Sequence, residues 1–352
     1  MKQIKKIIIL SAVLMFILCS CFRIDRNENA TVISAFPKNK EQQKIKSEYK
    51  HYANEYYNGV DYRLSRSEPG KYGGQIVVST IGEGPKTFNP WESKDATSSM
   101  VADLMYDSLF SSDADTGEVI PSLAKEMNVS DDLKTYTVTL RRGVKWTDGK
   151  EITADDVVFT WNEIIIAGFG NTSTRDSLFI DGEYPTVTKI DKYTIEFKIK
   201  KPFAPFQRLL SIQIAPEHVF KNVVKKGKRF FNSFMSTTVH PKEIVSSGAF
   251  MLEEYVPAQR VVLKRNPNYY VMDENKNLLP YIDKYVILIV GDLNNEMLKF
   301  EAGELDSISV RGKDLSRFKA KEKKSDFKLY NLGPATGTMI LAFRSEEHTS
   351  EL

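Results

Sequence analysis

The chain alternates between stretches with the period of strands and stretches with the period of helices. Five segments have strand-like alternation or β-branched runs: 75–80, 136–140, 193–199, 260–264 and 285–290. Apolar residues recur at helical spacing over 96–110, and 294–302 has the pattern of a short helix before Gly303. Strands and helices are mixed along the chain, with no internal repeat and no heptad pattern. This pattern predicts an α/β fold.

A third helix is predicted where Thr153 precedes an acidic and then an apolar stretch. Thr153 has the character of an N-cap, and Asp155 and Asp156 follow in the first turn, where the helix dipole favours acids. Neighbouring helical residues point about 100° apart, so the two carboxylates are poorly placed to act as an acid/base pair. We therefore expect them to favour the helix start and not to catalyse a reaction.

The N-terminus has the features of an export signal. Three lysines precede an apolar run of 12 residues, 7–18, which is short of the ~20 residues that span a bilayer. The sequence LCSC at 18–21 then resembles a bacterial lipobox, which implies cleavage before Cys21 and a diacylglycerol on its thiol. A plain signal with an incidental cysteine, or an uncleaved membrane anchor, is the alternative. Either reading predicts a protein outside the cytoplasm.

Composition fits a folded protein with little overall charge. The 352 residues are 41% hydrophobic and 27% charged, with a net charge of +3. Residues 1–20 contribute three lysines and no acid, so the remainder is neutral. A neutral chain argues against bulk electrostatic binding to nucleic acid or to an anionic membrane. We expect a monomer of more than one domain that binds no nucleic acid.

Motifs of catalysis and of metal or cofactor binding are not found. The sequence has no G-x-S-x-G elbow, no H-E-x-x-H and no Walker-type loop. Its two cysteines, Cys19 and Cys21, lie at the leader, and its four histidines lack metal-ligand spacing. We expect no enzyme activity, no cofactor and no metal site. An exported hydrolase would need a nucleophile and base that the sequence does not reveal.

An ordered series of phrases resembles the extracellular solute-binding proteins of ABC importers, family 5, whose members bind oligopeptides, dipeptides or nickel. The longest phrase is LRRGVKWTDGK at 140–150, continued by TADDVVF at 153–159. Family members commonly have His where Thr147 stands. The other phrases are GGQ at 73–75, PKTFNP at 85–90, MYDSLF at 105–110, PSLA at 121–124, APEHVF at 215–220, SGAF at 247–250, KRNPNYY at 264–270 and KFEAGELD at 299–306. The resemblance covers about residues 71–343.

The resemblance implies a two-lobed periplasmic-binding-protein-like fold of type II, in the large peptide-binding class. On that basis the sequence is expected to stop after most of the first lobe, so that the chain alone would not bind peptide tightly. The run RSEEHTSEL departs from the family pattern after Phe343 and is expected to be an artificial tail. The predicted divisions are a signal peptide at 1–20, a tether with some local helix at 21–70, a lobe I core at 71–109 and 241–335, an additional subdomain at 110–240, the start of a crossover at 336–343 and the tail at 344–352.

The resemblance also implies a function and partners. It predicts a lipid-anchored receptor that delivers a peptide-like solute to an ABC permease and its ATPase, on the periplasmic or outer side of a bacterial membrane. A receptor for nickel-chelate or oligosaccharide is the alternative, since the same fold serves these, and a surface adhesin is a further one. The loops expected to face the ligand are 87–91 and 246–250. Their candidate contact residues are Phe88, Asn89, Trp91 and Gly248, although core packing is an equally good explanation of Phe88 and Trp91.

Overall fold

The computed structural model describes residues 54–65, 68–113 and 117–330. The leader and its lipobox, the crossover and the tail lie outside these ranges. The chain divides into two compact units, each described here by itself: residues 9–308, and residues 309–352 together with 1–8. In the second unit, the described part contains helix α9 (Gly312–Glu322), whose buried Phe318 stacks edge-on against Phe327. No helix among the described residues has the length and apolar character needed to cross a membrane.

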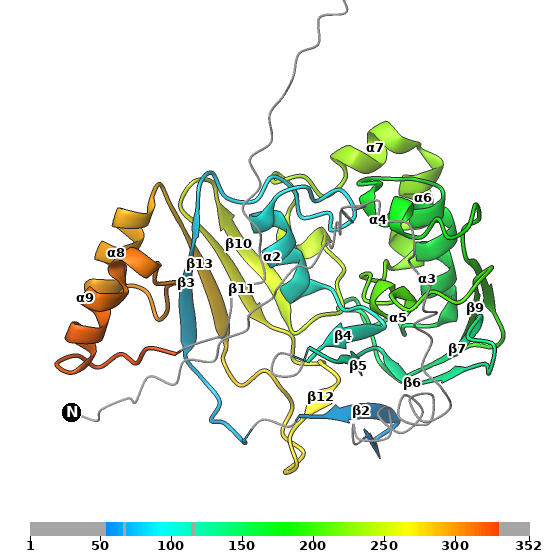
Figure 1. Cartoon of the computed structure of the whole chain (residues 1–352), viewed down its shortest axis with the longest axis horizontal. Coiled ribbons are helices and arrows are strands. Elements are labelled where there is room, and N and C mark those ends of the chain that lie inside the picture. The colour runs from blue at the N-terminus through cyan, green and yellow to red at the C-terminus, as the bar shows by residue number, and fades with distance from the viewer. Residues whose placement is uncertain (1–53, 66–67, 114–116, 331–352) are drawn as a thin grey trace, which may run out of the picture. The chain divides into compact units, whose positions relative to one another are not determined.

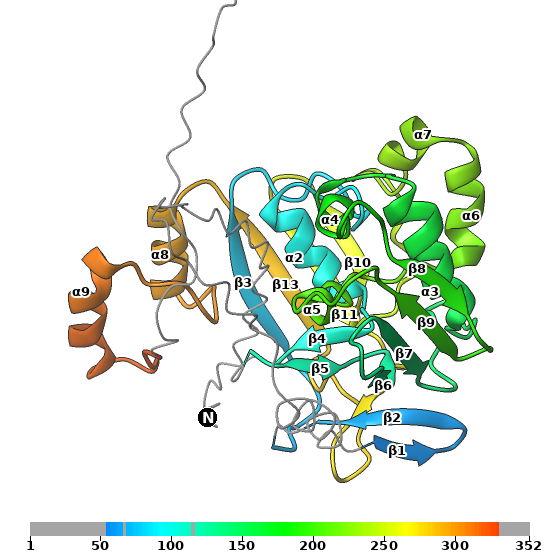
Figure 2. The ribbon, with the colours of Figure 1, turned by 45° about the vertical axis from the view of Figure 1, so that its right-hand side comes forward.

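The first unit is built on a four-stranded sheet. Its strands lie in the order β10 (Phe250–Val256), β11 (Arg260–Arg265), β13 (Lys284–Val290) and β3 (Gln75–Ile81). The first three are antiparallel, whereas β3 runs parallel to β13 (Figures 1 and 2). Helix α2 (Ala96–Met105) packs beside β10. The strands predicted at 75–80, 260–264 and 285–290 are confirmed. The helical pattern over 96–110 is correct at its start, but the helix ends at Met105 and Phe110 begins a strand.

A second four-stranded sheet is formed within 124–198. Its order is β6 (Ala124–Val129), β7 (Thr135–Leu140), β9 (Thr194–Lys198) and β8 (Thr186–Lys189), and every neighbouring pair is antiparallel. Helix α3 (Ala154–Phe159) continues as a π-helix over Thr160–Ile166 and packs on this sheet. Trp161 of that helix is fully buried, and its ring centroid lies 4.9 Å from that of Phe197 in β9. The strands predicted at 136–140 and 193–199 are therefore confirmed.

Shorter elements complete the first unit. A two-stranded ribbon joins the end of α2 to the second sheet, and a group of short helices follows that sheet. The elements are β4 (Phe110–Ser112), β5 (Val119–Pro121), α4 (Ser173–Ser177), α5 (Phe206–Leu209), α6 (Glu217–Lys225), α7 (Lys228–Ser233), a 3₁₀ turn (Pro241–Glu243) and α8 (Leu293–Glu301). The carboxylate of Asp292 caps α8 by accepting hydrogen bonds from the N–H groups of Asn294 and Asn295. The helix predicted over 294–302 is confirmed.

Residues 54–64 differ from the tether with local helix that the sequence predicted for 21–70. They form a hairpin of β1 (Asn54–Tyr57) and β2 (Val60–Leu64), and β2 also pairs with β12 (Val271–Met272). The Asp61 side chain is buried, where its carboxylate accepts from Lys125 at 2.9 Å and from the backbone N–H of Arg142 at 3.1 Å. The hairpin is thus bonded to residues far along the chain, and local sequence gives little sign of these partners.

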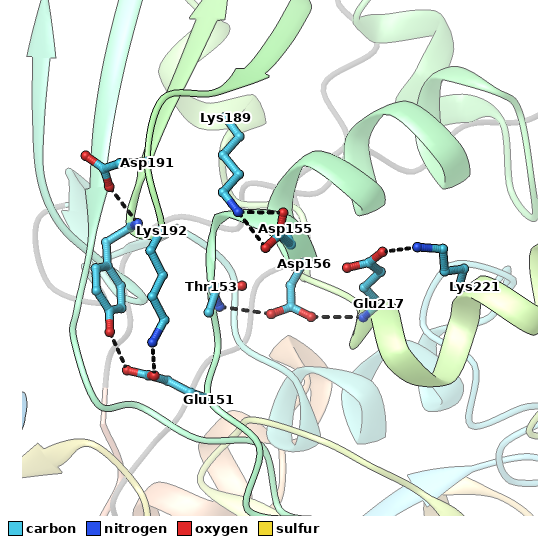
Figure 3. A network of polar contacts seen from close by, with 10 residues as sticks. Glu151, Thr153, Asp155, Asp156, Lys189, Asp191, Lys192, Glu217 and Lys221 are labelled. Atoms are coloured by element: carbon cyan, nitrogen blue, oxygen red, sulfur yellow. Dashed lines mark hydrogen bonds and ion pairs between the residues drawn. The ribbon is translucent and has the colours of Figure 1, made fainter.

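The two acids at the start of α3 have different surroundings (Figure 3). Asp155 is exposed and pairs with Lys189 at 2.7 Å. Asp156 is buried, and its carboxylate accepts from the N–H of Thr153 and from the N–H of Glu217, each at 2.9 Å. Burial raises the pKa of Asp156, and these hydrogen bonds oppose the rise. Both acids start the helix as predicted, but Asp156 also fixes the beginning of α6 against α3.

Candidate functional site

Three of the four candidate residues lie in the loop between β3 and α2. This loop is fixed at both of its sides. The N–H groups of Lys86 and Thr87 donate to Ser98 Oγ in the first turn of α2, at 2.8 and 3.2 Å. The N–H of Phe88 donates to the carbonyl of Met235 at 2.9 Å. The loop therefore connects the first sheet with the segment that follows α7.

The side chains of these three residues are enclosed by the chain itself. Phe88 is 1% exposed and meets Tyr255 edge to face at 5.5 Å. Asn89 is fully buried and donates from Nδ2 to the Phe231 carbonyl at 3.0 Å. Trp91 is 5% exposed, and its Nε1–H donates to the Gln213 carbonyl at 3.1 Å. Packing accounts for all three positions, and ligand contact at them stays a prediction.

Gly248 lies near the other end of α2. Its N–H donates to the Met105 carbonyl at 2.7 Å, and a Cβ at this position would lie 2.6 Å from the Met105 carbonyl carbon. Ser98, which holds the loop of Phe88, is two helical turns away from Met105, or about 10 Å along the axis. The loop of Phe88, Asn89 and Trp91 is therefore held at Ser98 and Gly248 at Met105, toward opposite ends of α2. The ring of Trp91 nevertheless reaches Tyr106, the residue after Met105, with 5.6 Å between ring centroids. Close backbone packing explains why glycine stands at 248.

The exposed positions nearest this loop lie where β3 ends. In open α/β sheets, ligands bind outside the carboxyl ends of parallel strands. The parallel strands β3 and β13 end at Ile81 and Val290, and the N–H of Gly82 donates to the Val290 carbonyl at 3.0 Å. At the end of β3 Ile81 is 44% exposed, and Glu83 and Lys86 in the following loop are also exposed. We take residues 81–86 as the candidate ligand-facing edge.

Side-chain hydrogen bonds hold the helices at this edge of the sheet. Thr80 Oγ1 and Thr97 Oγ1, in β3 and α2, are 2.7 Å apart. Ser79 Oγ donates to the carboxylate of Glu296 in α8 at 2.6 Å. The edge therefore presents main-chain groups, the apolar side chain of Ile81, and the opposite charges of Glu83 and Lys86, on a backbone that neighbouring helices hold in place. These groups suit the binding of a solute better than catalysis. Sequence motifs did not mark it, because Gly82 and Glu83 match no binding pattern.

A half-buried aspartate, Asp107, follows the C-terminal end of α2. The Asp107 Oδ2 atom is out of contact with solvent and accepts no hydrogen bond from the described residues. Burial raises the pKa of Asp107 to about 6, although the positive charge of Arg63 and hydrogen bonds from Tyr270 and Tyr269 act to lower it. Asp107 therefore interacts both with Arg63 of β2 and with Tyr269 and Tyr270, which precede β12. Its environment is that of a structural carboxylate and not of one that meets a solute.

Potential reactive groups elsewhere in the described ranges are spread apart. The divergent contacts of Asp155 and Asp156 exclude a shared acid/base role. His218 Nε2 lies 2.6 Å from Asp148 Oδ2, where it ties the start of α6 to the turn before α3. Over residues 54–65, 68–113 and 117–330, no three metal-ligating side chains come together.

Comparison with known proteins gives the family. The model of the bacterial extracellular solute-binding proteins, family 5, matches residues 118–349, and the chain belongs to this family. Members of the family bind solutes and are not enzymes, which agrees with the prediction of no catalytic site. The resemblance found in the sequence phrases is thereby confirmed.

Three relatives are similar over part of their length. A probable ABC transporter-binding protein of Deinococcus radiodurans is 34% identical, over 65% of this chain and 39% of the relative. The oligopeptide-binding protein AppA of Bacillus subtilis is 30% identical, over 73% and 44% respectively. The periplasmic α-galactoside-binding protein of Rhizobium meliloti is 33% identical, over 50% and 26%. The chain thus spans less than half the length of these relatives.

A solved structure of AppA extends the comparison to the fold. That structure, a complex with a nonapeptide, superposes with a TM-score of 0.60 at 29% identity, over 72% of this chain and 46% of AppA. The mixed α/β fold of the periplasmic binding proteins, predicted from the sequence, is confirmed.

Proposed function

We propose that this chain is part of the receptor of an ABC importer and that its solute is an oligopeptide. The observation that carries the proposal is the likeness to AppA, which is named as an oligopeptide-binding protein and is solved with a nonapeptide. The expected partners are the permease and ATPase of the importer. Genes for both beside the gene of this chain would support import, and an orphan gene without them would favour a surface adhesin.

The candidate edge at 81–86 suits a peptide main chain. Extended peptides bind many proteins by adding a strand, with main-chain hydrogen bonds for affinity and separate pockets for side chains. β3 is the outermost strand of its sheet. Asp306 bonds its outer edge at Val77, whereas Ile81 at its end and the following Gly82 and Glu83 are exposed. Ile81 would contact an apolar side chain, while Glu83 and Lys86 would meet charged groups of the solute.

An oligosaccharide is the second candidate solute. It is favoured by the likeness to the α-galactoside-binding protein, which is 33% identical over half of this chain. Sugars are bound through side-chain hydrogen bonds and aromatic faces, whereas peptides also use main-chain groups. Hydrogen exchange of this segment during titration with each solute separates the two functions, because a peptide should protect the amides of Glu83 and Gly84.

We further propose that a lipid on Cys21 anchors the receptor to the outer face of a membrane. The motif LCSC after a short apolar run supports it, and two or three acyl chains would hold the protein firmly. In a bacterial host, a Cys21→Ala variant should lose fatty-acid labelling and leave the membrane fraction. Persistent labelling and membrane association of that variant would contradict the anchor.

A further inference from the structure

One corner of the first unit carries an excess of positive charge. Residues 218–242 contain six Lys and Arg and no Asp or Glu, although the whole chain has a net charge of only +3. The rest of the chain therefore carries −3. Most of this charge lies at the turn between α6 and α7, in Lys225, Lys226, Lys228 and Arg229, all of them exposed. We call these four residues, with Phe230, the basic corner.

The four cations of the basic corner form no ion pair with the described acidic residues of the chain. By contrast, Lys221 of α6 pairs with Glu217 at 2.7 Å. Lys226 Nζ lies 4.4 Å from the centre of the Phe230 ring, and Lys228 Nζ lies 5.7 Å from that of Phe169. The ammonium groups remain at the surface, where a partner can meet them.

An exposed aromatic ring stands among these cations. Phe230 is 38% exposed and stacks on Phe234 at 6.3 Å. Phe231, the next residue, is fully buried and fixes α7 to α6 through a contact of 5.9 Å with Phe220. The corner therefore has a fixed backbone, an apolar centre and long cationic side chains around it. Figures 1 and 2 show α6 and α7 side by side.

We infer that the basic corner rests on the anionic phospholipid headgroups of the membrane to which the receptor is anchored. Lysines beside an exposed phenylalanine are typical of surfaces that bind anionic membranes, where the ring enters the interface and the ammonium groups meet phosphates. Three of the four cations are Lys, a residue that protein interfaces disfavour relative to Arg. This composition favours lipid over an acidic protein partner.

The length of chain before the first strand permits this placement. The inference rests on the proposed anchor at Cys21, which is followed by 32 residues before Asn54. At an extended length of 3.3–3.6 Å per residue, such a segment reaches at most roughly 110 Å. Any face of the first unit could therefore turn to the membrane, and the charged corner would select one orientation.

Flotation with lipid vesicles tests the inference without using the anchor. The full chain would carry Cys19→Ser and Cys21→Ser, so that no lipid is attached and the leader contributes equally to every variant. At low salt it should bind vesicles of equal phosphatidylglycerol and phosphatidylcholine at least about tenfold more strongly than vesicles of phosphatidylcholine alone. High salt should abolish the difference, because it screens the charges.

Two quadruple variants of equal net charge locate the effect. Replacing Lys225, Lys226, Lys228 and Arg229 with Gln should reduce the preference for anionic vesicles to the part that the lysines of the leader contribute. As the control, Lys71, Lys145, Lys150 and Lys264 would be replaced with Gln. These cations are exposed and form no ion pair among the described residues, so this variant should keep most of the preference. Phe230→Ser should weaken binding to anionic vesicles while the salt dependence remains.

Three results would overturn the inference. They are equal binding to both kinds of vesicle, equal loss in the two quadruple variants, and binding of a polyglutamate peptide at the corner in place of vesicles, which would identify an acidic protein partner. A failed anchor has a different signature, since fatty-acid labelling would then be absent while the vesicle preference persisted.

Discussion

A Trp91→Ala variant should lose about 3–5 kcal/mol of unfolding free energy, as buried tryptophans do when they are truncated. The indole packs edge-on against Phe220 at 4.8 Å and against Tyr106 at 5.6 Å. Its removal would leave a cavity between α2 and α6 and an unpaired carbonyl at Gln213. Chemical denaturation of the full chain measures the loss, with circular dichroism reporting the folded fraction.

The outcome also decides what Trp91 does. Trp91→Phe keeps an aromatic ring and loses only the Nε1 donor and part of the volume, so we expect a loss of about 1–2 kcal/mol. If Trp91 were held ready for a solute, Trp91→Ala would instead keep its stability within about 1 kcal/mol, the scale of ordinary surface substitutions. That result would indicate that Trp91 contacts a ligand and does not serve mainly in core packing.

A Gly143→Ala variant should lose about 3 kcal/mol or more and should loosen the N-terminal hairpin. Gly143 has φ +76°, which disfavours a side chain, and an added Cβ would lie 2.3 Å from the Gly59 carbonyl oxygen. That neighbour is backbone at the hairpin turn, so the hairpin must move away. Asp61 would then lose its bond to the N–H of Arg142.

Gly149 provides a matched control in the same segment. It has φ +89°, but an added Cβ would have no atom within 4 Å. Gly149→Ala should therefore cost only the backbone strain of about 1–2 kcal/mol. Limited proteolysis should cut residues 54–64 faster in Gly143→Ala and not in Gly149→Ala. Equal stability and equal cleavage of the two variants would show that the hairpin is not docked as described.

The sequence predicts five strands of the two main sheets well, whereas the other three, β6, β8 and β10, were not predicted. Strand alternation and helical spacing depend on neighbouring residues, so the strands near 75, 136, 194, 260 and 285 were placed within one or two residues. The capping position of Thr153 was also correct, because N-caps are local. The predicted division into a lobe core and a subdomain at 110–240 stays a prediction, since both lie within one compact unit.

Contacts between distant residues were not predictable in the same way. The hairpin at 54–64 owes its place to Lys125 and Arg142, and the second role of Asp156 depends on Glu217. Likewise, nothing local shows that Phe88 and Gly248 lie at different ends of α2. Family phrases identified the fold, but two of the candidate contact residues inside them, Phe88 and Asn89, are buried. The residues of the candidate edge that precede the phrase at 85–90, residues 81–84, match no motif.

Hydrogen exchange of the chain in the presence of solutes tests the central claim most directly. The chain would be titrated to millimolar concentration with a mixed pool of peptides, and in parallel with α-galactosides. A peptide receptor should show slower exchange of the amides of Glu83 and Gly84, by about threefold or more, with peptides alone. The N–H groups of Gly82 and Lys86 already donate within the protein, and Pro85 has none. Unchanged exchange of the Glu83 and Gly84 amides with peptides, or protection there by α-galactosides instead, would contradict the account.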